Sequence, residues 1–335
     1  MFIVHFILFV SFIFSSNFVY NSAEIFSINP DAQTGAYGGN NPTLLATNGQ
    51  IFNNPALGNI KSKDYISFTS RNHFSGLAKD YIFSTVIKQS FIKSLSLGFM
   101  YREVDDIPDT RNAFYFDGNI PVPIDYELIK FSKHWELGSI ISLSHTINNN
   151  KIGMNLKSLL YSLFNQKAYG FSLDIGSIYN ISDDILTGFI FKNVPFLKIN
   201  WSTGHSEIMI PTFQIGIHYL KTNFDFVMGF KTDLSFANGI NDYNSVLNFG
   251  FKKKINDRFN FLAGYNTSFS YSLGAEIKYR SFLINYAYIN SPKKIPFKSS
   301  HELTFGIEID KLNYLGKYIK PWGNIEHDFE YDRFR

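Results

Sequence analysis

Hydrophobic and polar residues alternate along the last three quarters of this 335-residue chain, in runs of about ten residues. In the run from Tyr271 to Arg280, Leu273 and Ile277 fall on one side of an extended chain, and Glu276 falls on the other. A period of two places successive side chains on opposite faces of a β-strand, and a helix does not produce it. Each run has about the length that crosses a bilayer when it is tilted.

The alternation predicts about fourteen strands, an even number, as in single-chain bacterial barrels. The predicted ranges are 64–74, 79–89, 92–104, 137–147, 151–163, 169–181, 185–193, 210–220, 224–233, 244–254, 259–267, 271–279, 281–290 and 301–310.

The connections between these strands are tight on one rim and mostly long on the other. The tight ones are at 88–91, 148–150, 182–184, 222–223, 256–258 and 280, and the longer ones are at 105–136, 164–168, 194–209, 234–243 and 291–300. Short periplasmic turns and longer outer loops are typical of membrane barrels. A soluble β-sandwich would explain the alternation but not the sorting of the loops. We therefore predict an all-β fold, a transmembrane antiparallel β-barrel over residues 64–310.

Composition agrees with this prediction. Aromatic residues make up 18% of the chain, with 36 Phe and 20 Tyr, which suits lipid-facing strands and interfacial girdles. A mean hydropathy of −0.08 argues against a bundle of membrane helices. The chain has no cysteine, which excludes disulfides, thiolate metal sites and thiol nucleophiles. Its net charge of +3 is small and scattered, so no nucleic-acid partner is expected.

The two ends differ from the barrel sequence. Residues 1–23 begin with an apolar run and resemble a secretory signal peptide, with a candidate cleavage site after Ala23. An uncleaved anchor is the alternative. Export and a barrel fold together predict the bacterial outer membrane, with its lipid as a partner. Residues 311–335 form a C-terminal tail that this topology places in the periplasm, either docked on a partner or the barrel rim, or disordered.

The segment 24–63 lacks sustained alternation and is rich in Gly, Asn, Pro, Ala and Thr. Its stretches Asp31–Gly39 (DAQTGAYGG) and Ala46–Gly58 (ATNGQIFNNPALG) resemble the opening of the PorV/PorQ family, relatives of the FadL fatty-acid transporter. Further similar stretches are Val104–Thr110, Phe171–Gly176 and Phe261–Tyr265, so the resemblance covers residues 25–310. It implies a fourteen-strand barrel whose N-terminal segment lies in the lumen as a hatch. The expected hatch residues are Gly35, Gly38, Gly39, Asn54, Pro55 and Ala56.

Glycines recur on the polar, lumen-facing side of the predicted strands. They are Gly98, Gly138, Gly153, Gly176, Gly188, Gly216, Gly229, Gly250, Gly264, Gly274 and Gly306. Glycine in a strand marks either a close approach of another backbone or a bend in the sheet. The row therefore either makes room for the hatch segment or relieves crowding as the sheet curves. Charges of both signs share this face, namely Asp174, Asp225, Lys231, Glu276, Lys278, Glu302 and Glu308.

Candidate chemistry is sparse. Asp105, Asp106 and Asp109 lie at the start of the longest outer loop, where clustered carboxylates could bind a hard cation such as calcium. Their spacing fits no known calcium loop, and a solvated turn is the alternative. No other metal site, no cofactor and no catalytic motif is expected, so we predict that the protein is not an enzyme.

Two functions follow. By resemblance to PorV/PorQ, the protein would be an accessory of protein export of the type IX kind, with secretion-system proteins or exported cargo as partners. The alternative is a FadL-like passive channel for hydrophobic small molecules such as long-chain fatty acids, one of which would bind in the lumen. A continuous apolar path from the outer loops to the hatch favours the channel. An outer mouth crossed by the 105–136 loop, above a wet or closed lumen, favours the accessory.

Overall fold

The structure is a computed structural model that describes residues 24–45, 50–59, 65–73, 76–87, 94–113, 116–117, 120–121, 125–148, 150–164, 166–234, 245–268, 270–290 and 299–309. The predicted signal peptide and the predicted C-terminal tail lie outside these residues. Within the described ranges, no helix has the length and apolar character needed to span a membrane.

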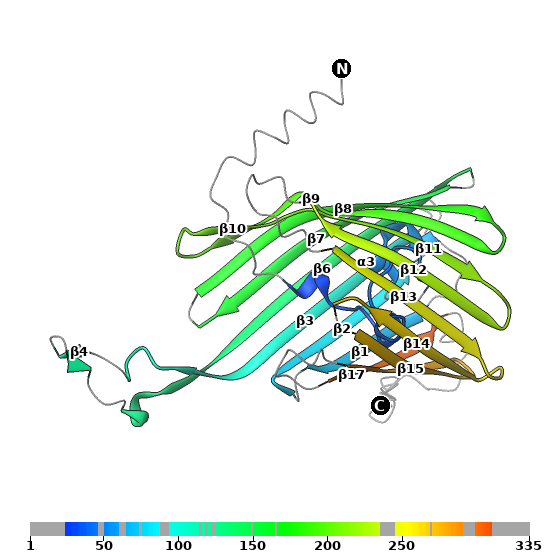
Figure 1. Cartoon of the computed structure of the whole chain (residues 1–335). Helices are drawn as coiled ribbons and strands as arrows, with labels where there is room; N and C mark the ends of the chain where they lie inside the picture. The colour runs from blue at the N-terminus through cyan, green and yellow to red at the C-terminus, as the bar shows by residue number, and fades with distance from the viewer. Residues whose placement is uncertain are drawn as a thin grey trace, which may run out of the picture.

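Fourteen strands of the described chain form a closed antiparallel barrel (Figure 1). They are β1 (Tyr65–His73), β2 (Ala78–Ile87), β3 (Ser94–Asp109), β6 (Lys130–Ile147), β7 (Asn150–Leu163), β8 (Gln166–Ser182), β9 (Ile185–Trp201), β11 (Thr212–Leu220), β12 (Phe224–Asp233), β13 (Ser245–Lys254), β14 (Phe259–Asn266), β15 (Ser270–Tyr279), β16 (Phe282–Ile289) and β17 (Ser300–Glu308). Each strand pairs with the next in the chain, and β17 pairs with β1 to complete the ring, with Ile66 opposite Ile307. The predicted barrel of about fourteen strands is confirmed.

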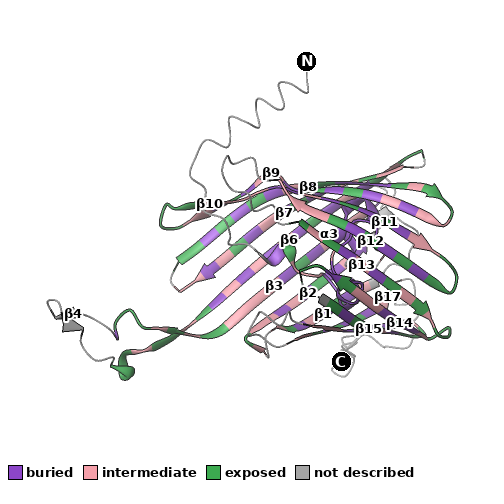
Figure 2. Ribbon diagram, in the orientation of Figure 1, coloured by how far each residue is buried: buried purple, intermediate pink, exposed green. Residues whose placement is uncertain are grey.

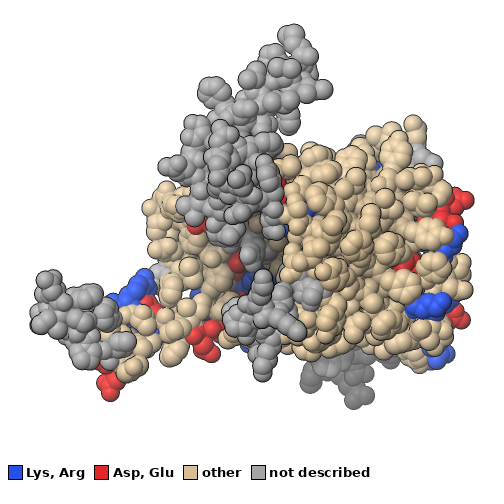
Figure 3. All heavy atoms as spheres, in the orientation of Figure 1, with Lys and Arg blue, Asp and Glu red and all other residues tan. Residues whose placement is uncertain are grey.

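The period of two in the sequence becomes an inner and an outer face. On β12, Phe226 and Met228 are each 41% exposed, whereas Val227 between them is fully buried. Figure 2 shows the same alternation of buried and exposed positions along the other strands. In Figure 3 the surface over the strands is almost free of charge, and charged side chains gather toward the two ends. An apolar band between two polar rims is the exterior of a transmembrane barrel.

The outer connections are more ordered than predicted. β3 and β6 continue pairing beyond the barrel as far as Asp109 opposite Lys130, past a bulge between Val104 and Ile107. This arm leads to the short pair β4 (Phe116–Asp117) and β5 (Ile120–Pro121) and to η4 (Tyr126–Leu128), and it projects away from the barrel (Figure 1). Strand pairing above the membrane needs no apolar face, so alternation could not predict it.

β9 also runs longer than predicted. It continues to Trp201, and β10 (Ser206–Met209) pairs back along it, so the predicted loop 194–209 is largely a hairpin. Register shifts opposite Phe171, Leu173 and Ile175 interrupt the alternation in this part of β9, which is why the sequence indicated a loop. At the other predicted outer loop of this region, β8 already begins at Gln166, so the 164–168 connection is a tight turn.

Four short elements precede the barrel strands. They are η1 (Glu24–Ser27), α2 (Ala32–Ala36), α3 (Gln50–Asn53) and η2 (Pro55–Asn59). α2 begins after Asp31, whose Oδ1 accepts a hydrogen bond of 2.6 Å from the backbone nitrogen of Thr34, the usual role of an N-cap aspartate. Because their side chains are almost all buried and pack on the inner face of the strands, the core of the molecule lies inside the barrel.

Candidate functional site

The N-terminal elements lie against inward-facing glycines of the strands. A Cβ atom at Gly153 would lie 2.7 Å from the carbonyl oxygen of Pro55, and one at Gly250 would lie 2.6 Å from that of Tyr37. Both distances are too short for any side chain, so only glycine fits. A Cβ atom would also lie within 3.0 Å of the N-terminal segment at other glycines, where a side chain that it meets can shift more easily than backbone can. These glycines are Gly98 against Phe52, Gly138 against Phe26, Gly176 against Asn54, Gly216 and Gly229 against Asn41, Gly264 against Ala36 to Gly38, and Gly274 against Ala36.

Three of the predicted glycines differ from the rest. The nearest neighbour of Gly229 is the side chain of Asn248 on the adjacent strand β13, with Asn41 of the N-terminal segment slightly farther away. The nearest neighbour of Gly188 is the side chain of Ile178 on the adjacent strand, with Thr43 of the N-terminal segment slightly farther away. Gly306 is buried on the inner face of β17. At Gly188, therefore, crowding within the sheet contributes to the choice of glycine.

Asn54 ties the N-terminal segment to the barrel wall through its side-chain amide. Its Nδ2 donates to the carbonyl oxygens of Ser177 and Phe189, both at 3.3 Å, and to that of Pro42 at 3.0 Å. Its Oδ1 accepts from the backbone nitrogen of Ala56 at 3.0 Å, which forms an Asx turn into η2. The predicted Asn54, Pro55 and Ala56 thus form one hydrogen-bonded turn against β8 and β9.

The glycines around α2 occupy positions of close approach. Gly38 has φ +87°, and a Cβ there would lie 2.6 Å from the carbonyl oxygen of Tyr265. The side-chain amide of Asn266 donates to the carbonyl oxygen of Gly38 at 2.8 Å. Gly39 also has a positive φ, of +109°, and Gly35 lies directly on the side chain of Glu302. The predicted Gly35, Gly38 and Gly39 therefore let the backbone of α2 and the turn after it touch the strands.

A buried ionic network lies at the outer ends of β1, β2, β3 and β17. Arg71 Nε lies 2.8 Å from Glu302 Oε1, and the two side chains are 1% and 0% exposed. The contact is an ion pair without an aligned hydrogen bond, since this Nε–H has no hydrogen-bond acceptor. Asp80 binds Arg102 Nε at 2.8 Å and His73 Nε2 at 2.7 Å. Arg71 also donates to the carbonyl oxygen of Asn29, so the network holds the N-terminal segment.

A second polar group of contacts lies toward the opposite ends of β11, β12 and β13. The hydroxyl of Tyr37 donates to Asp225 Oδ1, and Asp225 also pairs with Lys252 at 2.9 Å. His218 Nδ1 lies 3.0 Å from the carbonyl oxygen of Thr43. The N-terminal segment is therefore held by hydrogen bonds to charged side chains near both ends of the barrel.

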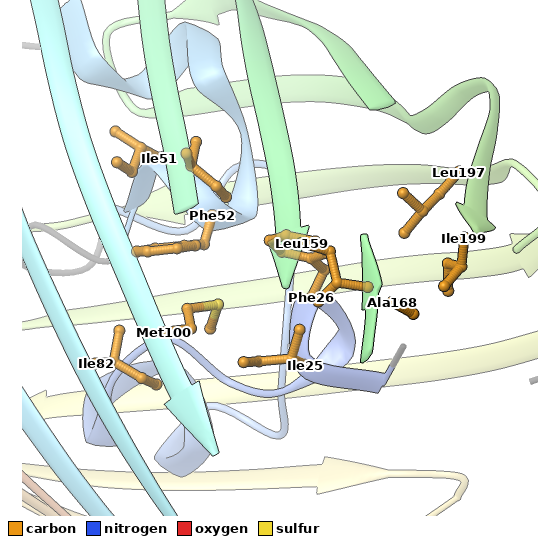
Figure 4. Close-up of a cluster of buried hydrophobic side chains, with 11 residues drawn as sticks. Ile25, Phe26, Ile51, Phe52, Ile82, Met100, Leu159, Ala168, Leu197 and Ile199 are labelled. Carbon is orange, nitrogen blue, oxygen red and sulfur yellow. The ribbon is translucent and has the colours of Figure 1, made fainter. Parts of the chain in front are cut away.

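Apolar side chains form part of the inner surface of the barrel, which we call the apolar wall (Figure 4). Ile25 and Phe26 from η1 and Ile51 and Phe52 from α3 pack on side chains from five consecutive long strands and from β2. These wall residues are Ile82, Met100, Ile140, Leu159, Ala168, Leu197 and Ile199. Ile28, Tyr161, Trp201 and Met209 continue the cluster. Trp201 lies at the outer end of β9, and Met209 lies opposite Leu197 where β10 runs back along β9, so the apolar surface reaches from the outer end of β9 to the N-terminal segment.

A basic cleft lies beside this wall. It lies between Phe26, Ser27 and Asn40 of the N-terminal segment and polar side chains of four strands, and its volume of about 20 Å³ has room for about one water molecule. These side chains are Lys157, Lys192, Asn193, Thr212, Gln214 and Lys231. Lys157 Nζ pairs with Asp174 at 2.6 Å, and Lys192 Nζ donates to the carbonyl oxygen of Phe52 at 2.8 Å.

The structure does not assemble the three predicted aspartates into a cation site. Asp105, Asp106 and Asp109 lie in the arm, where Asp105 Oδ1 pairs with Lys133 at 3.3 Å. Hydrogen bonds from Arg111 lower the pKa of Asp109 to about 2. Among the described residues, no three His, Asp or Glu side chains are placed to share a metal ion.

Sequence reasoning identified Glu302, Asp174 and Lys231 as lumen-facing but not Arg71, Asp80, Lys157 or Lys192. The sequence could have identified these four as inward-facing, because each lies an even number of positions from an inward-facing residue of its own strand, as Arg71 lies two positions from Thr69. Their pairing partners, however, lie on other strands and could not be inferred from this spacing.

Comparison with known proteins identifies the fold. No family model and no curated protein matches the chain. The toluene transporter TodX of Pseudomonas putida is similar in structure, with a TM-score of 0.59, 11% identity, and coverage of 84% of this chain and 99% of TodX. The monoaromatic hydrocarbon channel CymD has a TM-score of 0.54 at 12% identity, covering 85% of this chain and 97% of CymD. A Pseudomonas aeruginosa FadL homologue has a TM-score of 0.54 at 11% identity, covering 88% and 100%.

Proposed function

We propose that this protein is a passive channel of the bacterial outer membrane for hydrophobic small molecules, with residues 24–63 as its hatch. The observation that carries the proposal is the apolar wall, which reaches from Trp201 at the outer end of β9 to Phe26 and Phe52 of the N-terminal segment. A polar solute gains nothing from such a surface, whereas an apolar one is removed from water along its length.

The similarity to hydrocarbon channels supports the same function. The similarity concerns the fold, and the functions of TodX as a toluene transporter and of CymD as a monoaromatic hydrocarbon channel agree with an apolar path in this barrel. The expected PorV/PorQ export role finds no support in these similarities, which favour the channel alternative. The described part of the 105–136 connection also points away from the barrel and does not cross its mouth (Figure 1).

In this proposal the N-terminal segment closes the lumen and opens by a small displacement. The apolar wall is covered by Ile25, Phe26, Ile51 and Phe52, so a solute must displace these side chains to bind there. The hydrogen bonds of Asn54 and the ion pair of Arg71 hold the segment in its position against the strands. Neither a nucleophile nor a metal is required, which agrees with the expectation that the protein is not an enzyme.

Uptake of radiolabelled toluene and of hexadecanoate into proteoliposomes tests the proposal. We expect uptake well above that of protein-free liposomes. Met209→Asp places a charge on the apolar wall and should slow uptake several-fold, because an apolar solute must then pass a hydrated carboxylate. Ile208→Asp is the matched control, since the neighbouring residue on β10 faces the opposite side. Uptake equal to that of empty liposomes, or an equal effect of the two variants, would contradict the channel.

A further inference from the structure

The buried ionic network around Arg71 includes one residue of the N-terminal segment, Asp31. Asp31 lies within electrostatic reach of Arg71 and of Glu302. Three carboxylates, those of Asp31, Asp80 and Glu302, thus share the guanidinium groups of Arg71 and Arg102. The three carboxylate residues are each at most 1% exposed, so water does not screen their charges. When all three are ionised, the described part of this network carries one negative charge in excess.

Other charged side chains near Asp31 do not remove this excess. Glu276 on β15 lies within electrostatic reach of Asp31, but it is paired with Lys278 at 3.0 Å. Glu308 also lies on the inner face of β17, six residues beyond Glu302, which is about 20 Å along a strand. The inward-facing residues of β14 and β16, which also contact α2, carry no charge.

The imidazole of His73 can stay neutral in this network. Its Nε2 lies 2.7 Å from Asp80 Oδ2, and its Nδ1 lies 3.0 Å from the hydroxyl oxygen of Ser300. A neutral imidazole satisfies both contacts when Nε2–H donates to the carboxylate and Nδ1 accepts from the serine hydroxyl. His73 is therefore not required to carry the balancing charge.

The hydrogen bonds distinguish the three carboxylates. Both oxygens of Asp80 accept hydrogen bonds from Arg102, at 2.8 and 3.3 Å. By contrast, Asp31 Oδ2 and Glu302 Oε2 are buried and have no donor in the parts of the chain that the structure describes. A buried ionised oxygen without a donor is costly, and a proton bound there removes the charge. One proton on Asp31 or Glu302 therefore balances the network.

These two carboxyl groups lie where the N-terminal segment contacts the strands. Asp31 caps α2, and the backbone nitrogen of the next residue, Ala32, donates to Thr304 Oγ1 on β17 at 2.8 Å. Asn29 Nδ2 donates to Glu302 Oε1 at 3.2 Å. If the segment leaves the strands, water reaches both carboxyl groups, and each can ionise without the cost of burial. Binding of the proton and docking of the segment are therefore linked.

The direction of this linkage follows from burial. Burial raises the pKa of Asp31, which lies outside the strands, to about 6. A solvated aspartate has a pKa of about 3.9, so the docked segment holds a proton that the released segment loses. Docking is therefore strongest in acid and weakens as the pH rises through 6.

We propose that one proton shared between Asp31 and Glu302 locks the N-terminal segment onto the strands, and that loss of this proton favours its release. Acid then holds the lumen closed. This inference deepens the proposed function, and it rests on that function only for the consequence that release opens a path for solutes.

Cysteine labelling of the whole protein in nanodiscs tests the link. Ala32→Cys places a thiol next to Asp31, at a position that is fully buried while the segment is docked. Ser268→Cys places one in the exposed turn between β14 and β15, and the chain has no native cysteine. The ratio of the two labelling rates at one pH cancels the ionisation of the thiol itself, so it reports how often the segment is released.

We expect the ratio of the Ala32→Cys rate to the Ser268→Cys rate to be about tenfold larger at pH 8 than at pH 5, as linkage between the two pKa values of Asp31 requires. A ratio that is the same at both pH values would overturn the proposal.

Asp31→Asn, made in the Ala32→Cys protein, removes the titrating carboxyl group and keeps a side-chain oxygen that caps α2. The labelling ratio should then change less than about twofold between pH 5 and pH 8. Glu302→Gln is a second variant with the same expected result, because two carboxylates then face two guanidinium groups. A full tenfold change in both variants would overturn the proposal.

Three control variants identify the titrating group. His73→Gln and His218→Gln remove imidazoles that contact the network and the carbonyl oxygen of Thr43, and imidazoles titrate in the same pH range. Asp257→Asn removes a carboxyl group that is 93% exposed in the turn between β13 and β14. All three should keep the tenfold change. Its loss in either histidine variant would assign the proton to that imidazole and overturn the proposal.

The two proposals fail separately. If the labelling ratio rises with pH as expected but proteoliposomes take up neither toluene nor hexadecanoate, the proton lock stands and the channel does not. If uptake is rapid but the labelling ratio does not depend on pH, the channel stands and the proton lock does not.

Discussion

The ideal Cβ position of Gly153 on β7 lies 2.7 Å from the carbonyl oxygen of Pro55, the first residue of η2. The backbone of the N-terminal segment therefore touches the backbone of a barrel strand, with no side chain between them. Such contact is possible only where the strand carries glycine, and it makes the position of η2 sensitive to a single methyl group.

Gly153→Ala should therefore destabilise the protein by about 1–3 kcal/mol, the usual cost of forcing a methyl group into a packed site. Gly98→Ala should cost less, because its new methyl group meets the ring of Phe52, which can rotate away. Guanidinium titration in bilayers would measure both, and protease sensitivity of the segment would show whether η2 is displaced. Equal stability of Gly153→Ala and wild type would disprove the close contact.

The Arg71–Glu302 pair should matter far more than an ion pair on the rim. Arg71→Met leaves Glu302 buried without its cation, while Asp80 keeps Arg102, and the expected loss is about 3–5 kcal/mol. Glu302→Gln should cost less, since Arg71 keeps Asp80 at 3.5 Å. The matched control is Lys221→Met, which breaks an exposed pair with Asp184 and should change stability little. The temperature of the mobility shift in gel electrophoresis reports all three; a similar loss in all would argue against the buried network.

A disulfide between the N-terminal segment and the barrel should abolish uptake if the hatch must move. A Cβ at Gly58 would lie 3.3 Å from Ser144 Oγ, close to the separation of about 3 Å between a Cβ and the partner sulfur in a disulfide. The chain has no native cysteine, so the Gly58→Cys/Ser144→Cys variant forms one bond. We expect oxidation to stop toluene uptake and a reductant to restore it.

The matched control for this crosslink lies wholly in the barrel wall. Ser67 and Ser84 face each other on β1 and β2 with their hydroxyl oxygens 2.8 Å apart. The Ser67→Cys/Ser84→Cys variant carries the same kind of bond without touching the segment, and oxidation should not affect its uptake. Normal uptake by the oxidised Gly58→Cys/Ser144→Cys variant would rule out movement of η2 as the opening step.

Placing a charge on the outer face should destabilise the protein according to membrane depth. Met228 is 41% exposed near the middle of β12, and Met228→Lys should cost about 2–4 kcal/mol in a bilayer. Ile255→Lys is the control, because Ile255 is exposed in the turn between β13 and β14, where water solvates the ammonium. Guanidinium unfolding in bilayers measures the difference. Equal costs would place Met228 outside the hydrocarbon region.

Most of the barrel could be predicted because its signal is local. A strand with one face toward lipid needs an apolar residue at every second position, and β12 and β15 follow this rule almost without interruption. The prediction failed where that requirement ends. Asp109 and Lys130 pair above the membrane, where no lipid requires alternation of apolar and polar residues. In β9 the register shifts near Leu197, so the side chains that face inward change from one set of alternate positions to the other within the same strand.

The candidate site was less predictable, because its contacts join distant parts of the chain. The sequence indicated that Glu302 and Asp174 face the lumen, but not that Glu302 meets Arg71 or that Asp174 meets Lys157. It also gave no reason to group Lys192 with Lys231, which lie on strands that are not adjacent in the barrel.

The sequence by itself determined the strands, the face that each side chain takes and the inward row of glycines. Successive side chains in a strand alternate between its two faces, so the face depends only on the position along the chain. Only the tertiary structure decided what fills the lumen and which charges remain unpaired. Closing the ring brings β1 against β17 and places the N-terminal segment against strands from both halves of the chain, such as β6 and β16. Whether Lys231 has a counterion, or Gly153 a backbone neighbour, depends on residues far away in sequence, and folding alone brings them into contact.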